Sequence, residues 1–315
     1  MKAAVVTAYG EAPRYLDLPE PRAVGEHELV VEVLAAGLHP RVRMQAEGSH
    51  YTSSAEDLPL VPGIDGVGRG PDGRLWYFMS LGARAGSMAE RTVIDTRRAL
   101  MLPESTDPVT VAGTLNCAIA SWLVLSRRIP FEKGHNVLIL GATGGTGQMS
   151  VPVARHFGAG RVIAVGRDTG RLAALPGVDD IALLGDPESV ARVGAEVDVV
   201  LDYVWGEPAV AAMTALVQNR PEPARPLTWV QLGEIAGAQA SVPAGLLRSS
   251  GLQILGSGQG SLGTADMATE IPAVAAEIAR GTFAMKTTAI ALEHVEEAWN
   301  RPADSSSRIV LTAGS

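Results

Sequence analysis

The chain has 315 residues, of which 46% are hydrophobic, and it carries a formal net charge of -8. Its length exceeds that of a typical single domain, so two packed domains are expected. An acidic protein without a dense basic cluster repels a phosphate backbone, which argues against a nucleic-acid partner. The single cysteine, Cys117, excludes an internal disulfide framework and a cysteine-rich zinc lobe.

The first residues give no sign of a targeting segment. Met1 and Lys2 lead directly into the strand-like run Ala3 to Val6, without the apolar core of a signal peptide. No later apolar run is expected to approach the length of a membrane span. We therefore expect a cytoplasmic protein with no membrane partner.

The N-terminal third is predicted to be a compact, irregular β domain. Short apolar runs, separated by proline and glycine, predict strands at Leu29 to Ala36, Leu75 to Met79 and Ala89 to Ile94. Three polar segments between these strands are expected to be loops: Gly37 to Arg43, Gly48 to Tyr51 and Val61 to Gly68.

The segment from Pro108 to Arg128 has the spacing of a helix. Ala112, Leu115, Ile119 and Trp122 recur at near-helical intervals, and Pro130 lies beyond the end. This helix is expected to connect the two domains.

A strand followed by a glycine-rich turn is the strongest motif in the chain. The apolar run Val137 to Leu140 is typical of a buried parallel strand, and a helical pattern follows the turn. Glycines let a pyrophosphate approach main-chain N–H groups at the positive end of that helix. We therefore predict a dinucleotide site that includes Gly141, Thr143, Gly144, Gly145, Thr146 and Gly147.

The end of the next strand indicates which dinucleotide binds. An NAD site usually has an acidic residue about 20 residues after the glycines, to hold the ribose hydroxyls. This chain has Gly166 and Arg167 there, with Arg171 one helical turn later. Guanidinium groups suit a 2'-phosphate, so NADP(H) is predicted. The alternative is that the arginines are solvated and that Asp168 is a helix N-cap or the ribose acid.

Residues 131 to 258 alternate strand and helix, which predicts a doubly wound sheet. Six strands are expected: Val137 to Leu140, Val162 to Val165, Ile181 to Leu184, Val197 to Leu201, Leu227 to Leu232 and Leu252 to Leu255. Ligands bind at the carboxyl edge of such a sheet, so residues just after the later strands are expected to line the nicotinamide half of the site. These are Tyr203, Gly233, Ile235 and Ser257. Pro152 should bend the helix after the glycine turn.

The order of these motifs resembles the medium-chain dehydrogenase/reductase superfamily, and most closely its zinc-independent, quinone-oxidoreductase-like branch. The resemblance rests on Ala35-Ala36-Gly37, Gly48 to Tyr51, Val61 to Gly68 and the glycine turn at 141. It implies an α/β protein with a GroES-like β-rich catalytic domain, residues 1–117 and 264–315, and an inserted Rossmann NADP-binding domain, residues 118–263. It also implies a homodimer.

Zinc-dependent relatives have a cysteine ligand after the Ala-Ala-Gly segment and a histidine in a Gly-His-Glu element. Here those positions hold His39 and Ile64. A catalytic zinc needs about three protein ligands, so no metal is expected.

Three residues are candidates for the catalytic site. His39 stands where the quinone-reductase-like relatives usually have Asn, and it could donate a hydrogen bond or a proton; alternatively it fixes a loop carbonyl. Tyr51 matches the Tyr of the relatives' Gly-x-Tyr element and could orient a carbonyl. Asn116 lies one helical turn before Ala120, where relatives place a Thr near the nicotinamide, although an ordinary buried amide fits equally well.

These features predict an NADPH-dependent oxidoreductase that transfers hydride, without a metal, to a quinone or to the activated C=C of an enone or enal. Without a metal nothing strongly lowers the pKa of an alcohol, whereas conjugate reduction needs only donors to hold the enolate charge. The alternative is a non-catalytic NADPH-binding sensor or structural partner on the same fold.

Overall fold

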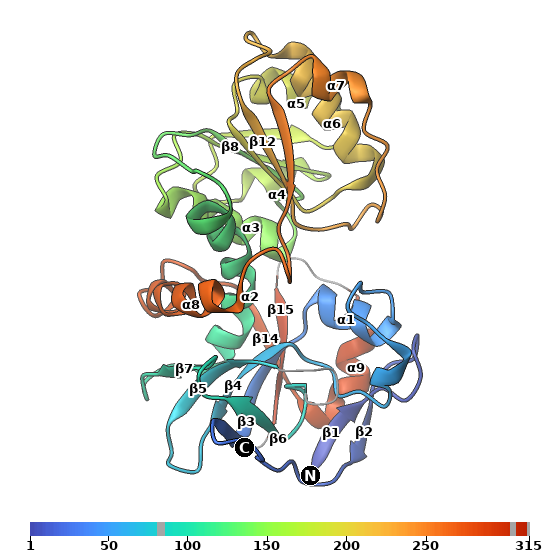
Figure 1. Ribbon diagram of the computed structural model, residues 1–315, viewed down its shortest axis with the longest axis vertical. Coiled ribbons are helices and arrows are strands. Elements are labelled where there is room, and N and C mark those ends of the chain that lie inside the picture. Colours follow the sequence, from blue (N-terminus) through green and yellow to red (C-terminus); the bar gives the residue numbers. More distant parts are fainter. Residues whose placement is uncertain (81–85, 303–306, 314–315) are drawn as a thin grey trace. The chain divides into compact units, whose positions relative to one another are not determined.

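The computed structural model describes residues 1–80, 86–302 and 307–313 (Figure 1). The chain divides into two compact units. The first contains Met1–Asn116 and Ala268–Ser315, and the second contains Cys117–Met267. The first unit is therefore discontinuous in sequence, and the second is inserted into it.

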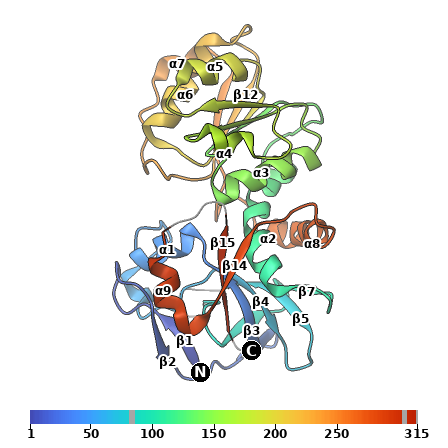
Figure 2. The same ribbon diagram turned by 180° about the vertical axis from the view of Figure 1, so that it is seen from behind.

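The first unit is built on a seven-stranded sheet in the order β14-β15-β3-β4-β5-β7, with β6 paired to β3 (Figure 2). Its strands are β3 (Glu28–Gly37), β4 (Asp65–Arg69), β5 (Leu75–Met79), β6 (Arg91–Asp95), β7 (Leu100–Leu102), β14 (Thr287–Ala291) and β15 (Arg308–Thr312). All pairs are antiparallel except β14 with β15. Because β15 pairs with β3, the C-terminal segment completes the N-terminal sheet.

Smaller elements surround this sheet. They are the antiparallel pair β1 (Lys2–Val5) and β2 (Arg14–Asp17), helices α1 (Pro40–Glu47) and α9 (Val295–Asn300), and 3-10 turns at Ala55–Asp57 and Leu292–His294. Arg43 of α1 donates from its guanidinium to the carbonyls of Ala298 and Trp299, and lies over the Trp299 ring. Since cations are favoured at a helix C-terminus, Arg43 fastens α1 to the end of α9.

Two segments expected to be loops are regular structure. Pro40–Glu47 forms α1, because Pro40 presets the first helical φ and Gly48, at φ 73°, ends the helix in the left-handed conformation. Asp65–Arg69 forms β4, because β3 and β5 pair with it on both sides. Its glycines hide the alternating pattern that marks a strand, so the loop expectation was wrong there.

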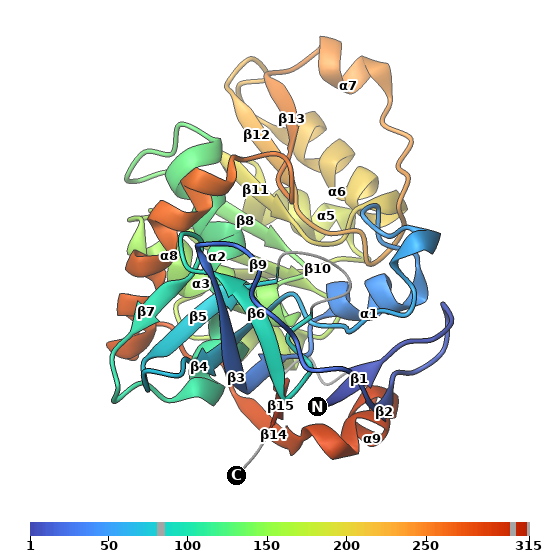
Figure 3. The ribbon, with the colours of Figure 1, turned by 60° about the horizontal axis from the view of Figure 1, so that its bottom comes forward.

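The second unit contains a six-stranded parallel sheet in the order β10-β9-β8-β11-β12-β13 (Figure 3). The strands are β8 (Val137–Leu140), β9 (Val162–Gly166), β10 (Asp180–Leu183), β11 (Val199–Asp202), β12 (Leu227–Gln231) and β13 (Leu252–Gly256). The helices between them are α3 (Gly145–His156), α4 (Thr169–Ala173), α5 (Pro187–Gly194), α6 (Gly206–Asn219) and α7 (Ala244–Arg248). This strand order is that of a doubly wound dinucleotide-binding sheet, which confirms the predicted fold class.

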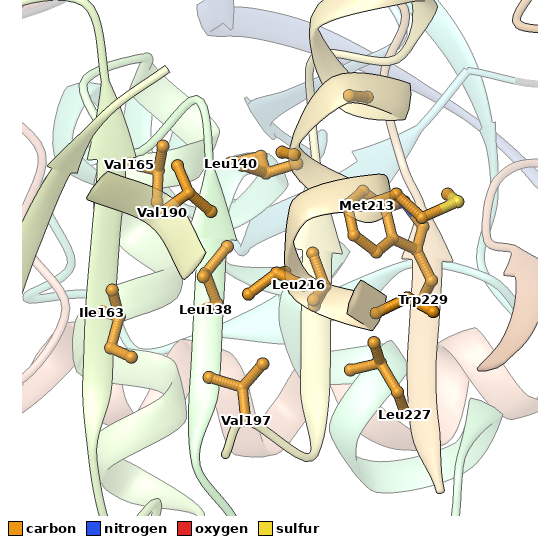
Figure 4. Close-up of a cluster of buried hydrophobic side chains, with 14 of the residues drawn as sticks. Leu138, Leu140, Ile163, Val165, Val190, Val197, Met213, Leu216, Leu227 and Trp229 are labelled. Carbon is orange, nitrogen blue, oxygen red and sulfur yellow. The ribbon is translucent and has the colours of Figure 1, made fainter. Parts of the chain in front are cut away.

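The main core of this unit lies between its sheet and the helices α5 and α6 (Figure 4). Leu138 and Leu140 of β8 and Trp229 of β12 are fully buried against Met213 and Leu216 of α6. Strands covered on both faces read as continuous apolar runs, which is why sequence reasoning could find them.

Helix α2 (Pro108–Leu123) continues into a π-helical turn at Val124–Arg128. Together they form a helix long and apolar enough to cross a membrane, and 72% of its most apolar window is buried inside the protein. A mostly buried core helix passes this test of length and composition as readily as a membrane span does, because it is apolar on most of its faces.

Among the described residues, an internal proline occurs in the helices that contain Pro152 and Pro272. Helix α3 runs through Pro152 to His156, and α8 (Thr264–Ala279) runs through Pro272. The helical assignment of α3 is continuous across Pro152, so the proline does not end the helix there.

Candidate functional site

The glycine turn has the geometry that a bound phosphate requires. Gly141 has φ +84°, a conformation that L side chains rarely adopt. A Cβ on Gly147 would lie 2.2 Å from the Gly141 carbonyl oxygen, so only glycine fits. Helix α3 starts at Gly145, and its N-cap, Gly144, provides no side-chain cap. The main-chain N–H groups of its first turn are thus suited to an anion.

The two arginines that were predicted to hold a 2'-phosphate follow β9. Arg171 donates from Nη2 to the Thr143 carbonyl oxygen at 3.1 Å, which brings its side chain to the glycine turn. Arg167 is exposed directly after β9. Gly166 packs against Thr143, whose side chain would lie 3.3 Å from a Cβ at position 166. Thr143, Gly166 and Arg171 are therefore neighbours.

Asp168 has a structural role in this unit. Its side chain accepts a hydrogen bond from the Arg171 backbone N–H at 3.0 Å and is the N-cap of α4. Of the two alternatives for Asp168, the N-cap is the one that the structure shows.

Tyr203 lies at the point where the strand order of the sheet reverses. It follows β11, which pairs with β8 on one side and β12 on the other. A Cβ on Gly233 would lie 2.9 Å from the Tyr203 carbonyl oxygen, and one on Gly141 would lie 3.4 Å from the Tyr203 Cβ. Three predicted cofactor residues, Gly141, Tyr203 and Gly233, thus pack together at the carboxyl edge, where doubly wound sheets bind ligands.

The Tyr203 side chain is fixed by serines. Ser150 Oγ donates to the Thr146 carbonyl oxygen at 3.0 Å, so in the 2.7 Å contact between Tyr203 Oη and Ser150 Oγ the phenol donates. Burial raises the pKa of Tyr203, while hydrogen bonds with Ser150 and Ser121 oppose that shift. The phenol is therefore protonated at neutral pH.

Ile235 and Ser257 lie beyond the ends of β12 and β13. Ile235 is 81% exposed, so its side chain is not packed in this structure. Ser257 is half-buried, and its N–H donates to the Gln231 carbonyl oxygen at 2.9 Å.

In the first unit His39 belongs to a buried polar chain. His39 is 2% exposed, and its Nε2 lies 2.8 Å from Asp65 Oδ1. Tyr77 Oη donates to the other carboxylate oxygen of Asp65 at 2.9 Å. An ionised carboxylate only accepts, so His39 Nε2 donates to it and the imidazole has one fixed orientation. Sequence reasoning had found His39 but not its two partners, because their side chains meet only in the folded sheet.

Tyr51 lies on a turn after α1 and is 68% exposed. Its ring stacks against the buried His50, with centroids 4.3 Å apart. Burial, followed by the charge of Arg41, lowers the pKa of His50 to about 4, so His50 is neutral at pH 7. Burial also lowers the pKa of Arg41, while Tyr51 and Asp65 raise it. These side chains form a polar cluster around the start of α1.

Asn116 is half-buried on α2, one turn before the half-buried Ala120. It is the last residue of the N-terminal part of the first unit. Its position neither favours nor excludes the role of an ordinary buried amide.

Within residues 1–80, 86–302 and 307–313, no three His, Cys, Asp or Glu side chains form a group that could hold a metal. Ile64, at the position of a zinc-ligating histidine in relatives, is buried in the apolar core of the first unit. Metal independence stays a prediction, to be tested directly.

Comparison with known proteins found NADPH-dependent quinone and alkenal reductases among the relatives of this chain. No family model matches the chain. A probable NADPH-dependent quinone reductase of Emericella nidulans is 29% identical, with 99% of both chains covered. An NADPH-dependent alkenal/one oxidoreductase of Arabidopsis thaliana is 26% identical over 65% of this chain and 57% of its own. The quinone oxidoreductase of Thermus thermophilus, solved also with NADPH, superimposes with a TM-score of 0.83 at 25% identity, covering 99% of this chain and 100% of its own.

Proposed function

We propose that the protein is an NADPH-dependent reductase of quinones or of enones and enals. The chain belongs to the medium-chain dehydrogenase/reductase superfamily, and NADPH-dependent quinone oxidoreductases are among its relatives. The observation that carries the proposal is the pairing of the glycine turn with two arginines, one of which reaches Thr143. That arrangement supports binding of a dinucleotide with a 2'-phosphate.

The second unit, Cys117–Met267, would hold the cofactor. The pyrophosphate would bind the backbone of Gly144 to Gly147 at the start of α3, and Arg167 and Arg171 would hold the 2'-phosphate. Tyr203 and Gly233, with Ile235 and Ser257, would line the nicotinamide half. When bound, NADPH supplies a hydride from C4 of its nicotinamide to a quinone or to the β-carbon of an enone.

The first unit would provide the catalytic groups. His39, held in one orientation by Asp65, would act as donor toward the carbonyl on which the enolate charge develops. Tyr51, exposed beside His50, would orient the substrate, and Asn116 would add a polar contact. Catalysis of this kind requires fixed donors rather than a metal, since the negative charge spreads over a conjugated system.

Consumption of NADPH with a panel of quinones, enones and enals tests this function. Turnover with at least one member, dependent on protein concentration, is the expected result. Tight NADPH binding with no turnover on the whole panel would instead support a non-catalytic sensor or partner protein.

We further propose a cytoplasmic homodimer, on the resemblance to the family. Light scattering that gives the mass of one chain at micromolar concentration would contradict the dimer, and a fluorescent fusion found outside the cytoplasm would contradict the location.

A further inference from the structure

The turn after β11 contains a strained residue. Trp205 has φ 52° and ψ -166°, and among the described residues it is the one non-glycine residue with positive φ. This conformation is close to a region that essentially only glycine occupies. Such strain persists only where the surrounding structure imposes it.

Asp202 supplies those contacts. Its carboxylate is fully buried at the end of β11. Oδ1 accepts hydrogen bonds from the N–H groups of Val204 at 2.8 Å and Trp205 at 2.9 Å. Oδ2 accepts from Trp229 Nε1 at 2.9 Å. One side chain thus holds two consecutive backbone groups of the turn and fastens them to the neighbouring strand β12.

Other contacts also hold the turn. The Tyr203 N–H donates to the Leu140 carbonyl oxygen at 3.1 Å, the Val204 carbonyl oxygen accepts from the Ala236 N–H at 2.9 Å, and the Trp205 side chain packs at the edge of the core cluster around β8 and α6. The two hydrogen bonds that Asp202 Oδ1 accepts are the side-chain contacts that hold the backbone of residues 204 and 205.

The backbone path of this turn determines where Tyr203 lies. The Tyr203 backbone packs between Gly141 and Gly233, and its phenol donates to Ser150 of α3, the helix that starts at the glycine turn. A change in the path after β11 would move Tyr203 relative to both glycines. Any such movement would disturb the cofactor edge without touching the cofactor directly.

We propose that Asp202 is a positioning residue for NADPH binding. It holds the strained turn at Trp205 and so fixes Tyr203 between Gly141 and Gly233. The inference rests on the proposed function, because it takes the carboxyl edge of this sheet as the NADPH site. Asp202 acts through Tyr203 and need not contact the cofactor.

The test compares NADPH dissociation constants in a double-mutant cycle of the full-length chain. Asp202→Asn has the same shape but one acceptor oxygen in place of two, so it cannot accept from both the turn and Trp229, and it should raise the dissociation constant roughly tenfold. Trp205→Gly alone should change it little, because glycine adopts this conformation without strain. In Asp202→Asn/Trp205→Gly the glycine adopts the backbone conformation of the turn without the Asp202 hydrogen bonds. The NADPH dissociation constant should therefore return to within about threefold of the wild-type value.

Trp229→Phe is the matched control. It removes the donor to Asp202 Oδ2 but leaves both bonds to the turn, so it should lower the melting temperature while NADPH affinity stays near that of wild type. If Trp229→Phe raises the NADPH dissociation constant as much as Asp202→Asn does, or if adding Trp205→Gly to Asp202→Asn does not restore NADPH affinity, Asp202 has only a structural role. Wild-type protein that binds no NADPH would overturn the proposed function, and this inference with it.

Discussion

His39 is the residue whose role matters most for the chemistry. It is buried, its imidazole donates to Asp65, and its ring packs against Gly37, where a Cβ would lie 2.7 Å from Nε2. A fixed imidazole of this kind can serve as a preorganised donor. The same contacts would also serve a residue that only holds the start of α1.

His39→Ala separates these roles. If His39 holds or protonates the developing enolate, the single-turnover hydride step should slow by about 10- to 1000-fold with NADPH affinity nearly unchanged. A lower melting temperature and a higher Michaelis constant, with an unaffected hydride step, would show a structural residue. His39→Asn restores a donor that carries no proton at neutral pH, so full activity of this variant at every pH would exclude proton transfer.

Partnerships between side chains were the least predictable part of the site. His39 could be chosen from the sequence because it departs from a family pattern. Asp65 and Tyr77 could not, since they lie 26 and 38 positions further along the chain and reach His39 only through the pairing of β3, β4 and β5. The partner of Asp202 was hidden for the same reason, because Trp229 comes from β12.

At the scale of elements, strands could be predicted where burial on both faces makes the sequence continuously apolar. All six strands of the second unit begin and end within two residues of the predicted limits. Helix α1 and strand β4 could not be predicted, because polar side chains and glycines mask their periodicity. Their structure is imposed by the neighbouring strands and by Pro40 and Gly48.

The start of α3 gives the prediction at this scale. Gly147→Ala places a Cβ 2.2 Å from a backbone oxygen, which cannot move aside as a side chain could. We expect roughly 1–3 kcal/mol of destabilisation and a clear loss of NADPH affinity. Chemical denaturation and cofactor titration measure the two effects.

Gly245→Ala in α7 is the control, because a Cβ there meets nothing within 4 Å. This variant should keep wild-type affinity and be equally or more stable. A Gly147→Ala protein that binds NADPH normally would show that the glycine turn does not hold the pyrophosphate.

At the scale of the whole molecule, the chain combines a discontinuous unit of mainly antiparallel strands with an inserted parallel sheet. We propose that the first is catalytic and the second binds the cofactor. The sequence indicates this division through its change from irregular strands to alternating strand and helix. The return of the C-terminal segment to the first sheet has no local signal and was expected only from the resemblance.

Metal independence is a prediction about the intact protein. Prolonged treatment with a strong chelator should leave both the melting temperature and the turnover of the reductase unchanged, because no residue of the proposed site needs a metal. Elemental analysis of the untreated protein is the companion measurement. Stoichiometric zinc that is lost together with activity would contradict this account.

The most direct measurement of the central claim is the ratio of kcat/KM for NADPH over NADH, in the wild type and in Arg167→Ala/Arg171→Ala. Arg248→Ala, an exposed arginine of α7, serves as the matched control. Wild type and control are expected to prefer NADPH, and the double variant should lose most of this preference, since each charge-assisted phosphate contact contributes about 1.5–3 kcal/mol. An equal loss of kcat/KM for NADPH and NADH in the double variant, or a wild type that prefers NADH, would contradict the proposed 2'-phosphate site.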